Sequence, residues 1–141
     1  MLNSQRFPFV ERTNSEGLAS FMPYLPITLT FRGNSVEALA LLDTGASVNV
    51  MPYDLGLQLG AIWEEQTVPI QLGGNLAQAE ARGLVISATV AEFPSTLLAF
   101  AWTENREAPL ILGHMNFFAE FDVCFYRADL AFEVRPRVKL L

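Results

Sequence analysis

Short apolar runs separated by turn residues dominate the chain from Pro23 onward. Residues 27–31 alternate and are rich in β-branched side chains, residues 32–35 form a turn, and residues 36–42 return as a run that becomes wholly apolar. This pattern is typical of a β-hairpin whose second strand enters the core. Further strands are expected at 66–72, 79–90, 95–102 and 110–112, and a closing hairpin at 124–126 and 130–134.

Helices are expected to be few and short. Residues 53–59 form one candidate, since Gly60 follows their end, and residues 115–121 form the better one. Many short strands with little helix predict an all-β barrel or sandwich. Residues 1–20 are polar and aperiodic, so we interpret 1–22 as a loosely held N-terminal arm and 23–141 as the domain.

Composition narrows the class of protein. With 141 residues, 51% of them hydrophobic and 17% charged, the chain fits one folded domain and is not disordered in bulk. The low fraction of charged residues leaves apolar surface for a subunit interface. A net charge of −6 argues against nucleic acid as a partner. No apolar run is as long as a membrane span, no signal peptide is visible, and Cys124 is the only cysteine, so we expect a cytoplasmic protein.

Asp43 is the candidate catalytic residue because it directly follows the apolar run that ends at Leu42. A carboxylate at the end of a buried strand is costly unless it has a purpose there. Thr44 and Gly45 follow, and small residues let the backbone turn its N–H groups toward the carboxylate. The alternative is an Asx turn of purely local origin, which these three residues alone favour.

The wider sequence context favours a catalytic role for Asp43 over a purely local turn. Residues 41–47 (LLDTGAS) resemble the catalytic strand of the retropepsin-like aspartic proteases, and residues 111–113 (ILG) resemble the apolar-apolar-glycine motif before that family's helix. Residues 118–123 resemble its helix-to-strand ending. The resemblance runs in order over about residues 23–135 and is closer to single-domain bacterial and retroviral-like members than to two-lobed pepsins. The position of the family's flap tip is occupied by Leu72, Gly73, Gly74, Asn75 and Leu76.

The resemblance implies a closed barrel with one short C-terminal helix, of the dimeric acid-protease fold, with Asp43 as the catalytic residue. Peptide hydrolysis by this class requires two carboxylates that share one proton. The remaining aspartates, Asp54, Asp122 and Asp129, are not followed by Thr-Gly or Ser-Gly. The pair must therefore come from two copies of Asp43 in a symmetric homodimer.

Roles for the neighbouring residues follow from the same resemblance. Thr44 would hydrogen-bond to the other subunit, Gly45 would offer backbone groups to the substrate, and Ala46 and Ser47 would complete the active-site loop. The flap would close over an extended polypeptide that adds to it as a strand. Trp63 either braces the base of the flap or packs in the core, and core packing is the stronger interpretation. An apolar pocket is expected from Val48, Val50, Leu76 and Ile111, with Leu112 and Gly113 as the structural motif.

One departure from the retroviral pattern concerns His114 and Ser47. Retroviral enzymes carry an arginine and an aspartate at these positions, so here a neutral hydrogen bond is expected in place of a charged pair. The chemistry at Asp43 is unaffected by that exchange.

Two functions remain open at this point. The first is an aspartic endopeptidase, a peptide hydrolase that acts on extended polypeptides. The second is a non-catalytic dimeric β-barrel that serves as an interaction module. No cofactor is expected, and no metal, because one histidine and one cysteine supply few soft ligands. The expected partners are a second copy of the chain and a polypeptide, without nucleic acid or membrane.

Overall fold

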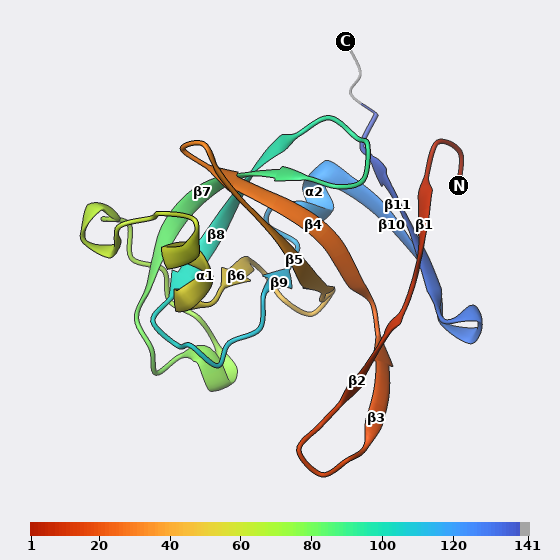
Figure 1. The fold of residues 1–141 in the computed structure, drawn as a ribbon, viewed down its shortest axis with the longest axis horizontal. Coiled ribbons are helices and arrows are strands. Elements are labelled where there is room, and N and C mark those ends of the chain that lie inside the picture. The colour runs from red at the N-terminus through yellow and green to blue at the C-terminus, as the bar shows by residue number, and fades with distance from the viewer. Residues whose placement is uncertain (139–141) are drawn as a thin grey trace.

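The computed structural model describes residues 1–138, and its largest unit is a closed six-stranded barrel with the strand order β4-β5-β9-β6-β8-β7 (Figure 1). Strands β5 and β9 run parallel, as do β6 and β8, whereas the other neighbours are antiparallel. The bounds of the barrel strands are β4 Tyr24–Phe31, β5 Asn34–Leu42, β6 Asn49–Met51, β7 Ala81–Thr89, β8 Thr96–Thr103 and β9 Ile111–Leu112.

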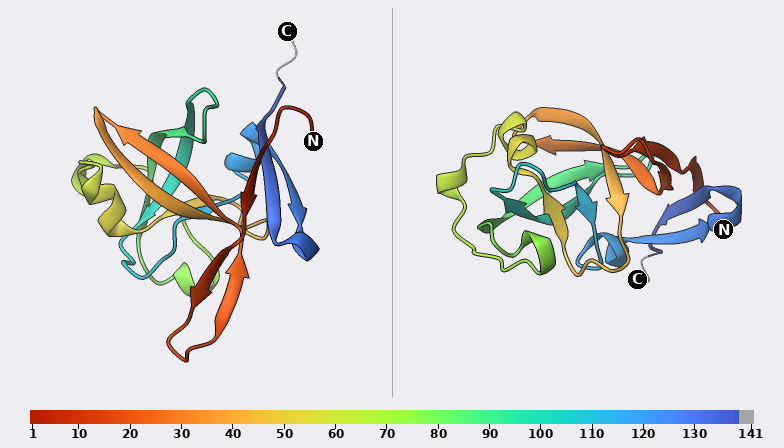
Figure 2. Two further views of the ribbon diagram at one scale, coloured as in Figure 1. Left: turned by 45° about the vertical axis from the view of Figure 1, so that its right-hand side comes forward. Right: turned by 90° about the horizontal axis from the view of Figure 1, so that it is seen from below.

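A separate three-stranded sheet stands beside the barrel, with β11 between β1 and β10. It brings the two ends of the chain together, because β1 pairs with β11 over the whole length of β1 (Figure 2). Alternate residues of β11 face the barrel, and Phe132 and Val134 are fully buried in the same core cluster as the barrel residues. The bounds are β1 Gln5–Pro8, β10 Phe121–Tyr126 and β11 Ala131–Pro136.

The remaining elements are short. A two-stranded hairpin of β2 Val10–Thr13 and β3 Ala19–Met22 projects from the junction of the barrel and the terminal sheet (Figures 1 and 2). The helices are α1 Tyr53–Gln58 and α2 Phe117–Glu120, and the 3-10 turns are η1 Trp63–Glu65, η2 Gly74–Leu76 and η3 Arg127–Asp129. Among residues 1–138, no helix has the length and apolar character needed to cross a membrane.

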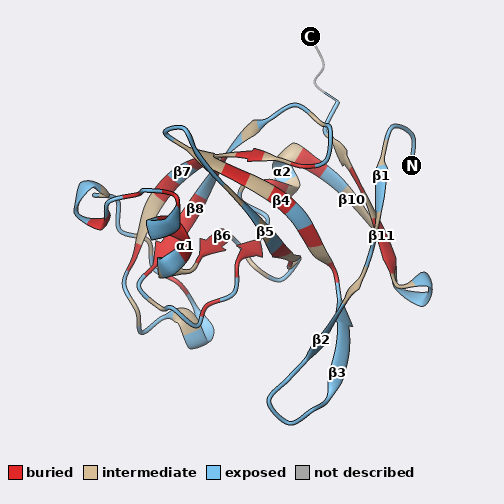
Figure 3. Cartoon of the chain, viewed as in Figure 1, coloured by how far each residue is buried: buried red, intermediate tan, exposed pale blue. Residues whose placement is uncertain are grey.

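The core explains why the barrel closes. Inward-facing residues of β4 alternate with outward ones, and Leu25, Ile27 and Leu29 are buried while Pro26 is exposed. Large aromatic residues fill the centre, since Phe100, Trp102 and Phe117 are almost fully buried. Figure 3 shows buried residues concentrated on the barrel strands and exposed ones along the β2–β3 hairpin. An all-β barrel was the expected architecture, and it is confirmed.

Several elements differ from the sequence prediction. Residues 66–72 form no strand and make only a single bridge to the barrel, between Pro69 and Arg82. Two hydrogen bonds flank this bridge, from the Ile70 N–H to the Ala81 carbonyl at 2.9 Å and from the Gly83 N–H to the Val68 carbonyl at 2.8 Å, and the pairing extends no further. The expected helix at 115–121 is shortened to α2, because Phe121 already belongs to β10 and pairs with Pro136.

The N-terminal segment is more ordered than an arm without regular structure. Residues 5–8 form β1, and Arg6 lies in salt-bridge distance of Glu133 on the neighbouring strand, at 3.7 Å. Ser4 donates a hydrogen bond to the same glutamate. The polar side chains that made this segment look like a tail in fact bond to the polar face of β11. The division of the chain at residue 22 stays a prediction.

Candidate functional site

Asp43 lies where β5 leaves the barrel. Leu42 pairs with Leu112 in the parallel β5–β9 ladder, and the Asp43 N–H donates to the Leu112 carbonyl at 3.0 Å. The chain then turns at once, since the Ala46 N–H donates back to the Asp43 carbonyl at 3.1 Å. The carboxylate is half-buried at this turn, so the ladder holds its backbone while its side chain remains accessible.

The turn places a backbone donor on the carboxylate. The Gly45 N–H donates to Asp43 Oδ1 at 2.9 Å, which is the geometry of an Asx turn. A Cβ at residue 45 would lie 3.3 Å from the same oxygen, so glycine allows the close approach. The local turn and the accessible carboxylate therefore occur together, and the two interpretations of this tripeptide do not exclude each other. Thr44 and Gly45 are both exposed.

Asp43 differs from the other aspartates in its charged surroundings. Asp54 pairs with Arg106, Asp122 with Arg135 at 3.1 Å, and Asp129 with Arg6 at 3.8 Å. Within residues 1–138, Asp43 has no such ion pair and no second aspartate beside it in its pocket. The described part of one chain thus supplies one carboxylate at this position.

The segment after β9 is hydrogen-bonded to the loop that follows Asp43. The His114 N–H donates to the Ala46 carbonyl at 3.0 Å, and the Met115 N–H donates to the Ser47 carbonyl at 2.8 Å. Gly113, the residue before His114, is buried, and a Cβ at this position would lie 2.6 Å from the Val48 carbonyl oxygen. The glycine of the expected motif is therefore required by close backbone packing.

Asn49 is an important residue that sequence reasoning missed. It is fully buried in β6, its Oδ1 accepts the Gly113 N–H at 2.8 Å, and its Nδ2 donates to the Ala99 carbonyl at 3.0 Å. A further bond runs from Nδ2 to Asn116 Oδ1 at 3.2 Å. One side chain thus joins the loop that follows Asp43 to β8 and to the start of α2. The available signal was an amide inside the apolar run Val48–Met51, which predicts a buried polar group with partners.

A pocket of about 240 Å³ opens beside Asp43. Ser47 and Val48 of the loop after Asp43 line it, together with Leu72 and Gly73. Its apolar lining rests on a second core cluster around Val50 and Ile111. The full lining is Asp43, Gly45, Ala46, Ser47, Val48, Val50, Leu72, Gly73, Leu76 and Ile111. Thr44, Gly74, Asn75, Leu112, Gly113 and His114 lie outside it.

The segment expected to be the flap lies next to this pocket as a turn. Residues 74–76 form η2, the Leu76 N–H donates to the Gly73 carbonyl at 3.2 Å, and Gly74 has a φ of +57°. Leu72 is buried, whereas Gly73, Gly74 and Asn75 are exposed. These residues therefore lie near Asp43, as expected for the flap tip. They form a short turn, and the preceding residues Gln66–Leu72 form no strand.

Aromatic packing fixes the beginning of that segment. Trp63 is buried between Tyr53 and Trp102, with ring centroids 5.7 Å and 5.1 Å away. The Arg82 guanidinium lies 4.5 Å from the centroid of the Trp63 ring, and its Nη1 donates to the Trp63 carbonyl at 2.9 Å. Core packing of Trp63 is thus confirmed, and the same contacts hold the chain before it reaches the pocket.

The expected bond between His114 and Ser47 is not formed. His114 is exposed, and its ring lies 5.4 Å from the ring of Phe118 on α2. Ser47 is bonded through its backbone carbonyl to Met115. The expectation was wrong because the backbones of the two segments pair directly, which turns the His114 side chain toward the helix.

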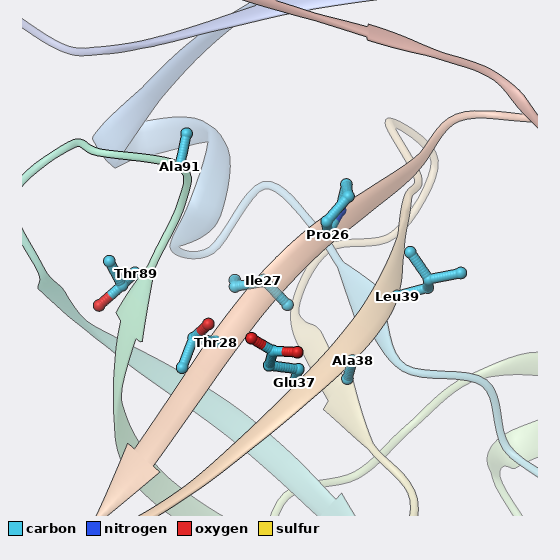
Figure 4. Close-up of a pocket in the computed structure, with 8 residues that line it drawn as sticks. All are labelled: Pro26, Ile27, Thr28, Glu37, Ala38, Leu39, Thr89 and Ala91. Atoms are coloured by element: carbon cyan, nitrogen blue, oxygen red, sulfur yellow. The ribbon is translucent and has the colours of Figure 1, made fainter.

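Further hollows lie elsewhere on the described part of the chain, two of them along the barrel strands. A shallow groove of about 480 Å³ runs over the outer face of β4 and β5, where Glu37 lies beside Thr28, Pro26 and Leu39 (Figure 4). An apolar groove of about 360 Å³ lies between β7, β8 and the Val68–Ile70 segment, and Val48 borders both it and the Asp43 pocket. Among the described residues, no three His, Cys, Asp or Glu side chains gather as metal ligands.

Comparisons with known proteins bear on the fold. No protein-family model matches the chain, and no curated protein sequence matches it. Among solved structures, it is similar to a retropepsin-like aspartic protease from Rickettsia conorii, with a TM-score of 0.60 and 13% sequence identity, over 94% of this chain and 99% of that one. At this identity the likeness concerns the backbone arrangement. Together with the closed barrel and the short helices, it shows that the chain has a retropepsin-like all-β fold.

Proposed function

We propose that the protein is an aspartic endopeptidase that hydrolyses extended polypeptides as a homodimer, with Asp43 of each subunit as the catalytic residue. The observation that carries the proposal is the accessible Asp43 carboxylate directly after the buried Leu42 at the end of β5, in a pocket with apolar side chains in its lining and without an arginine partner. The other three aspartates each lie beside an arginine, whereas Asp43 lines the pocket.

The reaction needs a carboxylate that removes a proton from water and an acid that polarises the scissile carbonyl. Two Asp43 side chains about 3 Å apart cannot both be ionised, so one keeps a proton and the two roles separate. Water attacks the carbonyl carbon, its proton passes to the ionised Asp43, and the protonated Asp43 donates to the carbonyl oxygen. Collapse of the resulting tetrahedral diol breaks the C–N bond, and the amine leaves with the proton that the first Asp43 had taken. The second Asp43, now ionised, takes the proton released by one diol hydroxyl, which gives the carboxylic acid product and restores the shared proton.

The surroundings of Asp43 supply positioning. The Gly45 N–H bond orients one carboxylate oxygen and leaves the other free. Thr44 is exposed and hydrogen-bonds to the second subunit in this proposal, and the exposed Gly73 and Gly74 contact the peptide backbone; their exposure supports both roles. The substrate is an extended polypeptide whose apolar side chain enters the pocket formed by Val48, Val50, Leu76 and Ile111.

The non-catalytic module remains the second candidate, since η2 is a short turn that rests on the buried Leu72 rather than a long β-hairpin over the pocket. A dimer that binds polypeptide without cleaving it would have this form. Cleavage assays on the wild type separate the two candidates.

The test compares the wild type with Asp43→Asn on a peptide library at mildly acidic pH. We expect the wild type to cleave and Asp43→Asn to lose at least about 10³-fold in rate, because amide cannot take the proton from water. Asp54→Asn is the matched control, since that exposed aspartate lies on α1 and is expected to leave cleavage unchanged. Cleavage retained by pure Asp43→Asn would contradict the mechanism, and a wild type that binds but never cleaves would favour the module.

A further inference from the structure

The β2–β3 hairpin projects from the end of the barrel that carries Asp43. Its base is fixed on two sides, because the Phe9 N–H donates to the Leu130 carbonyl at 2.7 Å and the Pro23 carbonyl accepts the Leu42 N–H at 3.0 Å. Leu42 is the residue before Asp43. The hairpin therefore leaves the molecule next to the candidate site, and it extends on the same side as η2 (Figures 1 and 2).

The hairpin is a built element with a complete turn. The Asn14 Oδ1 accepts the N–H groups of Glu16 and Leu18, at 2.9 and 3.0 Å, and the Asn14 N–H donates to the Leu18 carbonyl at 3.0 Å. Gly17 supplies the required φ of +80°. At the base, the Arg12 guanidinium lies 4.5 Å from the ring centroid of Tyr24. A preformed shape lowers the entropy lost on docking.

Nothing within residues 1–138 covers this hairpin. Strands β2 and β3 pair only with each other, so both outer edges are open, and every residue from 11 to 22 is exposed. Three large apolar side chains share this exposure, with 63% for Leu18, 41% for Phe21 and 40% for Met22. An isolated two-stranded hairpin is only marginally stable in water, so this element gains from a partner.

We infer that the β2–β3 hairpin is a clasp that docks on a second copy of this chain; this rests on the proposed function. Two Asp43 carboxylates that share a proton must lie about 3 Å apart, so the body of the second copy begins next to Leu42 and Pro23. The hairpin extends about 15 Å beyond that point, at roughly 3.4 Å per strand residue. A domain of this size has a radius of gyration of about 14 Å, so the hairpin is long enough to contact the body of a partner that begins there.

The chemistry of the contact follows from the residues that the hairpin exposes. Leu18 at the tip and Phe21 on the strand contribute apolar area, and the open edge of a strand contributes backbone hydrogen bonds. Twofold symmetry makes the contact reciprocal, so each subunit receives one hairpin and donates one. The hairpin then determines how tightly the two halves of the site are held, while Asp43 itself carries the reaction.

The test uses the full chain with Leu18→Ser and Phe21→Ser together, and Leu57→Ser with Leu97→Ser as the control pair. The control residues are matched in exposure, at 43% and 65%, and lie on α1 and β8. Sedimentation equilibrium gives the dimer dissociation constant. We expect the hairpin pair to raise it at least about tenfold and the control pair to leave it unchanged, with equal thermal stability for both. An unchanged constant in the hairpin pair would overturn the inference.

A second measurement identifies the occupant directly. A photoreactive benzoylphenylalanine in place of Leu18 is irradiated in the presence of a bound peptide. We expect a covalent dimer of the chain, whereas a product with the peptide, or no intermolecular product, would exclude the second copy as occupant. The cleavage assay on Asp43→Asn is independent of both measurements. Failure of the hairpin clasp and failure of the proposed function are thus seen separately.

Discussion

Asp43 and Asn49 show two ways in which a polar residue can end up inside an apolar stretch. Asp43 ends the run of β5 and stays half-exposed beside a pocket, whereas Asn49 is fully buried and uses its amide to join three segments. The first arrangement leaves a reactive group accessible, and the second holds the accessible group in place.

Replacement of Asn49 tests that positioning. Asn49→Ala leaves the buried Gly113 N–H without its side-chain partner, which costs about 1–3 kcal/mol, and it also removes the part-buried bonds to the Ala99 carbonyl and to Asn116. We expect a loss of about 2–4 kcal/mol in the free energy of unfolding by urea. The exposed Asn75 is the control, and Asn75→Ala is expected to change the free energy of unfolding by less than about 0.5 kcal/mol. Equal effects for the two variants would contradict the role of Asn49.

Gly113 gives a second prediction at this scale. A Cβ at residue 113 would lie 2.6 Å from the Val48 carbonyl and 2.8 Å from that of Ala46, so Gly113→Ala must displace the backbone of the loop. We expect a loss of about 1–3 kcal/mol in unfolding free energy. Gly83→Ala is the matched control, because its Cβ would meet nothing closer than 3.5 Å. A Gly113→Ala variant as stable as the control would show that the loop accommodates a Cβ without cost, and would contradict the requirement for glycine.

At the scale of the elements, the β4–β5 hairpin and the motifs around Asp43 and Gly113 were predictable from the sequence. Alternation and turn residues specify a hairpin locally, and the motif residues occur where close backbone packing requires them. The segment 66–72 was not, because its apolar residues face the pocket and β7 rather than pairing as a strand. The strand β1 was also not predicted, since it depends on a partner strand more than 120 residues away.

The η2 turn carries a prediction that depends on the proposed function. Gly74 has a φ of +57°, so Gly74→Ala strains the turn by about 1 kcal/mol and lowers the equilibrium constant for forming the turn by about fivefold. We expect kcat/KM for peptide cleavage to fall by up to about this factor. Gly33→Ala, at a φ of +86° in the β4–β5 turn, introduces similar strain away from the pocket. If both variants cleave as the wild type does, the η2 turn takes no part in the reaction.

The attachment of β1 to β11 is expected to depend on pH. The hydrogen bond from Ser4 is the main cause that lowers the pKa of Glu133 below its ordinary 4.5, with a further contribution from Tyr126. A lowered pKa in the folded state adds stability above about pH 4.5 that is lost as the pH falls through the lowered value.

Guanidinium unfolding midpoints of wild type and Ser4→Ala test this dependence. We expect a constant difference in stability from neutral pH down to about pH 5, and a shrinking difference below about pH 4.5 as Glu133 becomes protonated in the unfolded chain first. Ser20→Ala, on the exposed strand β3, is the control for loss of a serine hydroxyl. A difference between wild type and Ser4→Ala that keeps its size in acid would contradict the bond to Glu133.

At the scale of the whole molecule, the apolar residues of the sequence are used in several places. Most of them fill the core shared by the barrel and the terminal sheet, some line the Asp43 pocket, and others are exposed, including those along the hairpin. The sequence indicated a single domain with surface left for a partner. It could not indicate where that surface lies, because the position of the hairpin relative to Asp43 follows from how β1 and β4 are anchored in three dimensions.

The central claim is that one active site needs Asp43 from two subunits. The most direct measurement mixes wild type with Asp43→Asn at constant total protein, with time for subunits to exchange, and follows the cleavage rate. If mixed dimers are inactive, the rate falls with the square of the wild-type fraction, and that is the result we predict. A rate that falls in simple proportion to the wild-type fraction would mean that one Asp43 is sufficient, and would contradict the account.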